Sequence, residues 1–209
     1  CAYGTYVARD FGFPEWRGEP LAGKSILVYA EQGLGDQIMF ASCLPDLLQH
    51  AGRCIVECSP QLEKLFRRSF PRVTVRAGEQ TNRDSSWISG LGAIDYQVAI
   101  GSLPLHFRSD LTRFPHHGGY LQTDPERCAY WRERLETLGA GSKIGISWRG
   151  GAVSTRRESR SIPLEQWLPL VSQGSCHFVS LQYGDNGEES GRFTREHGVP
   201  VHHWQQAID

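Results

Sequence analysis

Apolar residues along this chain occur in short clusters with two alternating spacings. Continuous apolar runs predict strands at 25–30, 54–58, 73–75 and 96–100, and helical spacing lies between them at 36–50 and 60–70. The first run, Ser25-Ile-Leu-Val-Tyr-Ala30, has no polar alternation, which is typical of a strand buried on both faces. Strands and helices that alternate at this spacing predict a parallel sheet with right-handed crossovers.

Turn and breaker residues mark the boundaries of these elements. Pro45 is expected to kink the first helix. The fourth strand is expected to end in a turn over Gly101-Ser-Leu-Pro104. The first twenty residues, rich in Gly, Pro and aromatic residues, are expected to form an ordered lead-in, and 78–92 is expected to be irregular.

The alternation stops and then restarts. An amphipathic helix is predicted from Pro125 to Leu138, opened by Thr-Asp-Pro and stopped by Gly139. The restarted pattern predicts strands at 143–148, 177–181 and 199–202, with helices at 164–171 and up to His197.

This organisation predicts an α/β protein with two sheets. We assign 1–124 to a Rossmann-like N-terminal domain, 125–142 to an interdomain helix and linker, and 143–209 to the start of a second Rossmann-like domain. Because two or three strands do not make an independent sheet domain of this type, the second domain is expected to be truncated.

The composition is that of a soluble globular protein, with 39% apolar and 22% charged residues. No run approaches the roughly 18 apolar residues of a spanning helix, so no transmembrane segment is expected. The N-terminal residues lack the basic and apolar regions of a signal peptide. Six cysteines without a Cys-x-x-Cys pair indicate neither a disulfide framework nor a zinc ribbon, and a reduced, cytoplasmic setting fits best.

The charge is balanced overall but unevenly placed. With a formal net charge of −1, the chain as a whole lacks the excess of positive charge that is typical of nucleic-acid-binding proteins. A local cluster of positive charge lies at Lys143, Arg149, Arg156, Arg157 and Arg160, where Glu158 is the only acid. Such a patch on a neutral protein favours a small anionic ligand over a polyanion.

The run Glu31-Gln-Gly-Leu-Gly-Asp36 follows the first strand and opens the first helix. As a dinucleotide fingerprint it is weak, because the third glycine is missing and an acid stands where the phosphate would dock. Two interpretations of Asp36 remain open. It is a helix cap, favoured by the dipole and the free amides, or it is an ionised carboxylate at the carboxyl edge of the sheet that can accept a proton.

A second candidate site runs from Trp148-Arg-Gly-Gly151 to Arg160. Glycines after a strand let the backbone approach an anion, and guanidinium groups grip phosphate in a bidentate manner. Arg149, Arg160 and Thr155 would supply charge and donors; the alternative is a solvated basic loop. Tyr183, which follows a later strand, is a candidate for stacking on a nucleoside.

Metal binding is not expected. The pairs His116-His117 and His202-His203 are adjacent in sequence, have no accompanying carboxylate cluster, and adjacent loop residues seldom hold one ion. Signatures of Ser or Cys nucleophiles are also absent from the sequence.

Three segments closely resemble one bacterial family: Trp16 to Lys24, Ile26 to Phe40 and Lys143 to Gly151. The family is the glycosyltransferase-like domain found after tetratricopeptide repeats. It is related to the ADP-heptose:lipopolysaccharide heptosyltransferases and is similar to glycosyltransferase family 9. The resemblance implies a GT-B fold, in which the acceptor approaches the first Rossmann-like domain and the nucleotide-sugar sits mainly on the second.

The resemblance also implies roles for individual residues. Asp36 matches the general base. The acceptor would lie against Gln32, Gly33, Gly35 and Gln37, and the donor against Arg149, Gly150, Gly151, Thr155, Arg160, Gln182 and Tyr183. Arg160 stands near a position that is usually Lys in heptosyltransferases. The family's later nucleotide-binding loop would lie beyond Asp209, so the fragment alone is expected to be inactive.

The implied reaction is the inverting, metal-independent transfer of a sugar from a nucleoside-diphosphate sugar to a hydroxyl of a saccharide or protein acceptor, without a cofactor. One alternative is a non-catalytic module that binds nucleotide-sugars or protein partners. Another is a dinucleotide-dependent oxidoreductase, which the missing third glycine and the presence of Asp36 disfavour.

Overall fold

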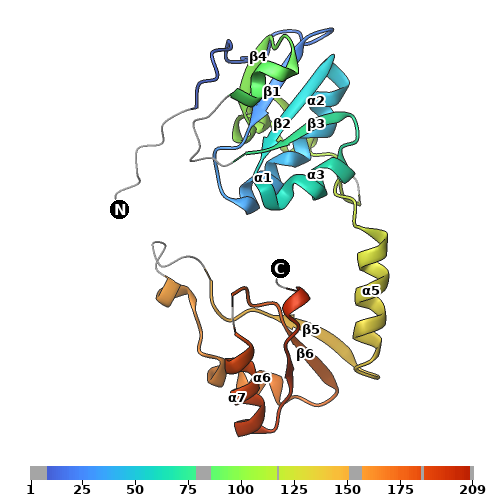
Figure 1. The fold of residues 1–209 in the computed structure, drawn as a ribbon, viewed down its shortest axis with the longest axis vertical. Helices are drawn as coiled ribbons and strands as arrows, with labels where there is room; N and C mark the ends of the chain where they lie inside the picture. Colours follow the sequence, from blue (N-terminus) through green and yellow to red (C-terminus); the bar gives the residue numbers. More distant parts are fainter. Residues whose placement is uncertain (1–8, 79–85, 117, 151–156, 185, 208–209) are drawn as a thin grey trace. The chain divides into compact units, whose positions relative to one another are not determined.

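The computed structural model describes residues 9–78, 86–116, 118–150, 157–184 and 186–207 (Figure 1). The predicted donor residues Gly151 and Thr155 lie outside the described residues. The chain divides into two compact units, Cys1–Asp124 and Pro125–Asp209. Each unit has its own sheet.

The first unit is built on a parallel sheet in the order β3-β2-β1-β4. Its strands are β1 Ser25–Tyr29, β2 Arg53–Cys58, β3 Val73–Ala77 and β4 Tyr96–Ala99. In the register, Leu27 of β1 lies between Ile55 and Gln97. β1 is therefore an inner strand, and its last four residues are buried, as the continuous apolar run predicted.

The lead-in segment adds to this sheet beside β4. Glu15 forms a parallel bridge with Gln97, and the backbone N–H of Trp16 donates to Gln97 O at 2.8 Å. Nearer the N-terminus, the Arg9 guanidinium donates two hydrogen bonds to the Glu57 carboxylate of β2, at 2.5 and 2.9 Å. The described part of the lead-in is therefore fixed on the sheet, in agreement with the expectation of an ordered segment.

Three helices follow β1 and β2 in the chain: α1 Leu34–Phe40, α2 Leu44–His50 and α3 Glu63–Ser69. A short 3-10 segment separates α1 from α2, and Pro45 lies in the first turn of α2. A kink was expected at this proline; the structure instead interrupts the helix at Ala41–Cys43 and begins a new helix at Leu44. A proline is tolerated there because the first N–H groups of a helix have no intrahelical acceptor.

Two predictions for the remaining loops have different outcomes. The predicted turn at 101–104 is wrong, because the 3-10 segment Ile100–Ser102 leads directly into the helix α4, Leu103–Phe107. Pro104 stands in the first turn of α4, where proline favours a helix start. In the segment expected to be irregular, Ser86–Leu91 forms a 3-10 helix, and 79–85 lies outside the described residues.

Both faces of the first sheet are covered. On one face, Ile26 and Val28 belong to a large core that includes Leu47 of α2 and Phe66 of α3. On the other face, Leu27 packs in a smaller cluster whose members are Ile55, Leu91 and Ile94, with Phe11, Phe13, Trp87 and Ile88 at its margin. Alternate residues of β1 thus serve two cores, one on each face of the sheet.

The second unit has a parallel sheet in the order β5-β6-β7. Its elements are α5 Pro125–Glu136, β5 Ser142–Ile146, α6 Leu168–Val171, β6 Cys176–Ser180, α7 Gly187–His197 and β7 Val201–His202. Ile146, Leu164, Phe178 and Phe193 form the centre of its core. Because Ile26 and Ile146 lie in different sheets, the prediction of two sheets is confirmed.

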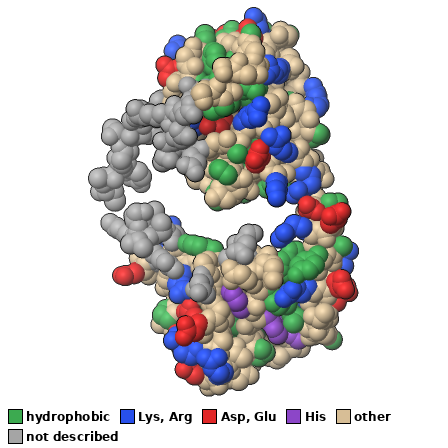
Figure 2. Space-filling view, viewed as in Figure 1, with side chains coloured by type: hydrophobic (Ala, Val, Ile, Leu, Met, Phe, Trp, Pro, Cys, Tyr) green, Lys and Arg blue, Asp and Glu red, His purple; other side chains and the backbone are tan. Residues whose placement is uncertain are grey.

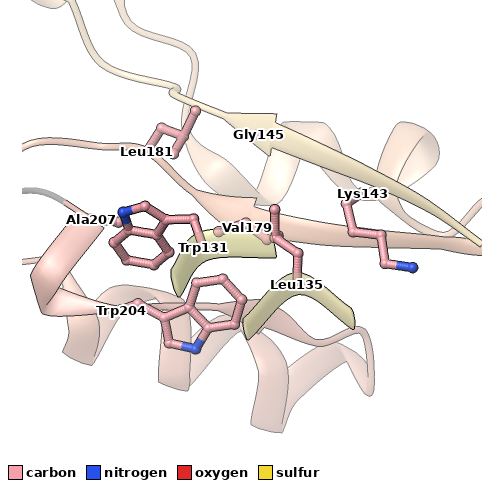
Figure 3. Close-up of a pocket in the computed structure, with 8 residues that line it drawn as sticks. All are labelled: Trp131, Leu135, Lys143, Gly145, Val179, Leu181, Trp204 and Ala207. Carbon is pink, nitrogen blue, oxygen red and sulfur yellow. The ribbon is translucent and has the colours of Figure 1, made fainter. Parts of the chain in front are cut away.

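The other face of the second sheet is only partly covered. A cavity of about 320 Å³ lies between α5 and the sheet, where Trp131 and Leu135 of α5 face Val179 and Trp204 (Figure 3). No residue of α5 is fully buried, so the amphipathic pattern predicted for this helix buries less than expected. A sheet of so few strands offers the helix little apolar surface to cover.

Charged side chains of both signs are spread over both units in the view of Figure 2, and the histidines visible on this face belong to the second unit. No large area of a single sign stands out on this face, in keeping with the net charge of −1. None of the helices in the described part of the chain has the length and apolar character needed to cross a membrane.

Candidate functional site

Asp36 lies at the carboxyl edge of the first sheet, in the loop and helix start that follow β1. The N-cap of α1 is Gly33, which makes no side-chain cap, and Asp36 stands in the first turn. Its Oδ2 would be 3.3 Å from a β-carbon placed on Gly33, so the carboxylate folds back over the loop. We find no hydrogen bond or ion pair between Asp36 and the residues that the structure describes. The interpretation of Asp36 as the helix cap is therefore not supported.

Gln37 has a different position from the one predicted. Its side chain is fully buried and donates to Gln32 O at 2.9 Å and to Ser59 Oγ at 2.8 Å, while its Oε1 accepts from Ser59 N at 2.9 Å. The expected contact between Gln37 and an acceptor is corrected accordingly, because no surface of this side chain is exposed. Gln37 instead ties the loop after β1 to the loop after β2.

The other predicted acceptor residues are accessible. Gln32, Gly33 and Gly35 are all exposed, and Gln32 Nε2 donates to Glu31 Oε1 at 3.2 Å. Glu31 was not among the predicted site residues. It is half-buried, and burial raises the pKa of its carboxyl group despite a hydrogen bond from Gly101 N. Its position in the sequence could have singled it out, because it is an acid only two residues beyond a buried strand.

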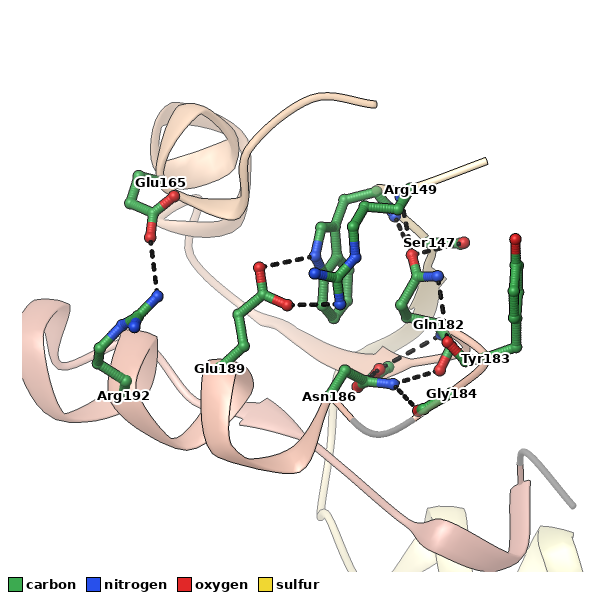
Figure 4. Close-up of polar contacts among 11 residues, drawn as sticks. Ser147, Arg149, Glu165, Gln182, Tyr183, Gly184, Asn186, Glu189 and Arg192 are labelled. Atoms are coloured by element: carbon green, nitrogen blue, oxygen red, sulfur yellow. Dashed lines mark hydrogen bonds and ion pairs between the residues drawn. The ribbon is translucent and has the colours of Figure 1, made fainter. Parts of the chain in front are cut away.

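In the second unit, the loop after β5 is held by Gln182 (Figure 4). The buried Oε1 of Gln182 accepts from Arg149 N at 2.7 Å, from Trp148 N at 3.1 Å and from Ser147 Oγ at 3.2 Å. Gln182 was predicted to touch the donor. That prediction is corrected, because the side chain is fully buried and its oxygen is used within the protein.

Arg149 is paired with an acid that the sequence did not single out. Its Nη2 lies 2.7 Å from Glu189 Oε2, with 29% and 22% of the two side chains exposed. The other oxygen of Glu189 accepts from Trp148 Nε1 at 3.2 Å. Glu189 stands in the first turn of α7, where an acid is favoured by the dipole alone, so the sequence gives no sign of this partner.

Three of the other predicted donor residues, Gly150, Arg160 and Tyr183, belong to the described part of the second unit. Arg149 bridges Ser161 in antiparallel fashion, and a β-carbon on Gly150 would lie 3.4 Å from Arg160 O. The structure therefore brings Arg149, Gly150 and Arg160 together. Arg160 is exposed, and Tyr183, next to Gln182, is 52% exposed.

A buried asparagine fixes the loop that carries Tyr183. Ser180 Oγ donates to Asn186 Oδ1 at 2.9 Å, and Asn186 Nδ2 donates to Gly184 O at 2.7 Å and also to Gln182 O. Tyr183 is thus presented between two anchored residues at the carboxyl edge of β6, where an open α/β sheet binds its ligands.

Cysteine and histidine side chains form no group of three with acids that could hold a metal ion within the described residues. The five described cysteines are free. Burial raises the pKa of the Cys54 and Cys58 thiols to about 12, and the two residues behave as small apolar side chains of the core.

Comparison with known proteins gives one informative similarity. Protein FlbA of Caulobacter vibrioides is 35% identical to this chain over 204 residues, which cover 93% of the chain and 34% of FlbA. The chain therefore spans about a third of the length of this relative. No protein-family model matches the chain, and no solved structure matches it. The name of FlbA states no activity.

Proposed function

We propose that this chain is part of a GT-B glycosyltransferase related to the heptosyltransferase-like domains that follow tetratricopeptide repeats. The reaction is the inverting transfer of a sugar from a nucleoside-diphosphate sugar to an acceptor hydroxyl, with no metal required. The observation that carries the proposal is the Asp36 carboxylate, which lies at the carboxyl edge of a parallel sheet and has no polar partner among the described residues.

Asp36 would act on the acceptor. As the acceptor oxygen attacks the anomeric carbon, its proton passes to the Asp36 carboxylate, and the bond from that carbon to the diphosphate oxygen breaks. General-base help of this kind contributes about 10²–10⁴ in rate. The helix start that stabilises the charge of Asp36 also weakens it as a base, so its effect depends on position.

The second unit would hold the donor. Arg149 and Arg160 are brought close together by the bridge between Arg149 and Ser161, and they would meet the negative charge that develops on the leaving diphosphate. Fixed positive charge can take the place of a metal in this role. The exposed ring of Tyr183 would stack on the nucleobase.

The pairing of Arg149 with Glu189 favours a second candidate function. A cation that already has a carboxylate partner at 2.7 Å offers less charge to a leaving group. The same residues would then serve a non-catalytic module that binds a nucleotide-sugar or a protein partner.

Asp36→Asn tests the two functions against each other. The change is nearly isosteric but removes the proton acceptor, so turnover should fall about 10²–10⁴-fold while donor affinity stays the same. Release of nucleoside diphosphate from ADP-, GDP- and UDP-sugars by the complete protein, with saccharide and protein acceptors, measures turnover. Calorimetry with the free diphosphates measures affinity.

Asp110→Asn is the matched control, because Asp110 is 53% exposed on a turn of the same unit. Equal loss of donor binding, with turnover of bound donor unchanged, would assign Asp36 to binding or structure. Donor binding without turnover in wild type and variant would support the non-catalytic module.

A further inference from the structure

Glu31 is a second carboxylate at the edge of the sheet that carries Asp36, and the proposed reaction leaves it without a role. It follows β1 by two residues and precedes Asp36 by five. Its side chain points to the loop after β4, which is the parallel neighbour of β1. The β1–α1 loop is therefore attached to the sheet at this point by an acidic side chain.

The attachment is made through one oxygen of Glu31. Oε1 accepts the backbone N–H of Gly101 at 3.1 Å and the side-chain amide of Gln32 at 3.2 Å. Hydrogen bonds to a carboxylate are among the stronger ones in proteins. Glu31 thus fixes both its own loop and the first turn after β4.

Gly101 is adapted to this contact by having no side chain. A β-carbon at Gly101 would lie no more than 3.0 Å from both Glu31 Oε1 and Gln32 Nε2, and 3.3 Å from the Phe40 ring. These atoms surround the α-carbon of Gly101 so closely that alanine would push Glu31 away. The glycine is required by close approach and not by an unusual backbone angle, because its φ is not positive.

The second oxygen of Glu31 is buried, and it has no hydrogen-bond partner among the described residues. Burial raises the pKa of this carboxyl group, since an ionised form would be poorly solvated there. Among the residues that the structure describes, no cation lowers the pKa of this carboxyl group. Glu31 is therefore a poor candidate for the solvent-facing base, and a good candidate for a fixed support.

A matching support lies just beyond the loop, in the first turn of α1. Gln37 joins the loop to Ser59, which follows β2, the neighbour of β1 on its other side. The loop is thus tied to β4 through Glu31 and to β2 through Gln37. Asp36 lies between the two ties and takes part in neither of them.

We propose that Glu31 is the positioning residue for Asp36: through Gly101 and Gln32 it fixes the β1–α1 loop so that the Asp36 carboxylate stays free to meet the acceptor hydroxyl. The role rests on the proposed function, since it gives Asp36 its geometry for proton transfer. It also explains why an acid and a glycine far apart in sequence occupy these two places.

The test separates position from folding. In the complete protein, Glu31→Ala should lower kcat by about 10- to 100-fold, because a displacement near 1 Å can cost on the order of 10²-fold. Affinity for ADP, GDP and UDP, which bind the second unit in the proposal, should not change. Glu31→Gln keeps an oxygen that accepts from Gly101 N–H, and it should restore most of kcat.

Gly101→Ala should reproduce the loss, whereas Gly90→Ala, whose β-carbon meets nothing within 4 Å, should behave as wild type. Amide hydrogen exchange at Gly101 and across 32–36 provides a readout that does not need turnover, and Glu31→Ala should speed it. Exchange that stays as slow as in wild type would overturn the tether. Faster exchange with full kcat would overturn the positioning role.

A failure of the proposed function would look different. The wild-type protein would then turn over none of the nucleotide-sugars, and the positioning role would fall with it, while slow wild-type exchange at Gly101 that Glu31→Ala accelerates would still identify the tether. A Glu31→Gln variant as inactive as Glu31→Ala, with slow exchange and unchanged diphosphate affinity, would make the carboxyl itself part of the reaction and overturn the proposal.

Discussion

In both units a buried glutamine supports the loop after the first strand, but the charged residue beside that loop is an acid in the first unit and a base in the second. Each has a fully buried glutamine behind the loop that follows its first strand, Gln37 in the first unit and Gln182 in the second. In the first unit the supported loop leaves Asp36 without a polar partner among the described residues. In the second it leaves Arg149 paired with Glu189. A buried amide can therefore hold a loop whatever charge the loop presents.

The two glutamines also differ in what they hold. Gln37 Oε1 accepts from one backbone N–H, that of Ser59, whereas Gln182 Oε1 accepts from two, those of Trp148 and Arg149, and from a hydroxyl. An uncharged amide suits both places because it has a donor and an acceptor and adds no charge beside the functional one. Because two backbone N–H groups rely on Gln182 and one on Gln37, we expect the second unit to depend more on its glutamine.

The largest expected effect in this comparison is on stability. Each buried N–H that loses its acceptor costs about 1–3 kcal/mol, so Gln182→Ala should lower the unfolding free energy by roughly 3 kcal/mol or more, and Gln37→Ala by less. Urea unfolding followed by probes in each unit measures the two losses. The exposed Gln173→Ala is the control for a lost glutamine. Equal losses of unfolding free energy in Gln182→Ala and Gln37→Ala would contradict the expected difference between the two units.

The next effect concerns the charge that Arg160 brings to the donor. Arg160→Ala should weaken binding of nucleoside diphosphates to the complete protein about tenfold or more, since a charge-assisted hydrogen bond contributes roughly 1.5–3 kcal/mol. Folding should be little affected, because the side chain is exposed. Calorimetry with ADP, GDP and UDP decides, and Arg192→Ala, 55% exposed in the same unit, controls for net charge. Identical affinities in wild type and Arg160→Ala would show the loop to be a solvated surface.

A smaller effect, of opposite sign, is expected at Glu189. Glu189→Gln keeps an oxygen for Trp148 Nε1 but removes the negative charge beside Arg149. Because a partly exposed ion pair contributes up to about 1 kcal/mol, diphosphate affinity should rise by as much as about fivefold. The same calorimetric titration measures it. Unchanged or weaker binding would mean that Arg149 is not a phosphate ligand and that the pair is structural.

The smallest effect is a pH dependence of the first unit. Burial makes the pKa of Glu31 higher in the folded protein than in the unfolded chain, where it is about 4.3. The contribution of Glu31 to stability is therefore fully present below about pH 4.3, and it is lost as the pH rises through the pKa of the folded protein. Glu31→Gln does not titrate. Its unfolding free energy relative to wild type should therefore increase with pH above about 4.3. Urea unfolding between acidic and neutral pH tests this, with Glu63→Gln as control, and a difference that stays constant with pH would contradict it.

The strands and the two sheets were predictable because they depend on local pattern. The run 25–30 has the apolar continuity of an inner strand. Pro45 inside helical spacing indicated that the helix would not continue straight, and the structure has two helices there. The turn predicted at 101–104 failed because a proline after a strand is compatible both with a turn and with a helix start. The packing of Leu103 in the core favours the helix start.

The side-chain partners in the site were not predictable in the same way. Glutamine is mostly a surface residue, so nothing local distinguishes Gln37 or Gln182 from exposed ones. Their burial depends on Ser59 and on the loop after β5, 22 and more than 30 residues away. Glu189 is likewise 40 residues from its cation, and only the packing of α7 against the second sheet brings them together.

The lead-in segment sets a limit on how the first unit can be shortened. Residues 14–16 occupy the outer side of β4, and Arg9 neutralises Glu57, whose side chain is 2% exposed. A chain trimmed to begin at Ser25 would carry an open strand edge, a template for pairing with other copies. It would also bury a carboxylate without its cation, at a cost of about 3–5 kcal/mol. Expression work on this unit therefore has to keep Arg9, or replace Glu57 together with it.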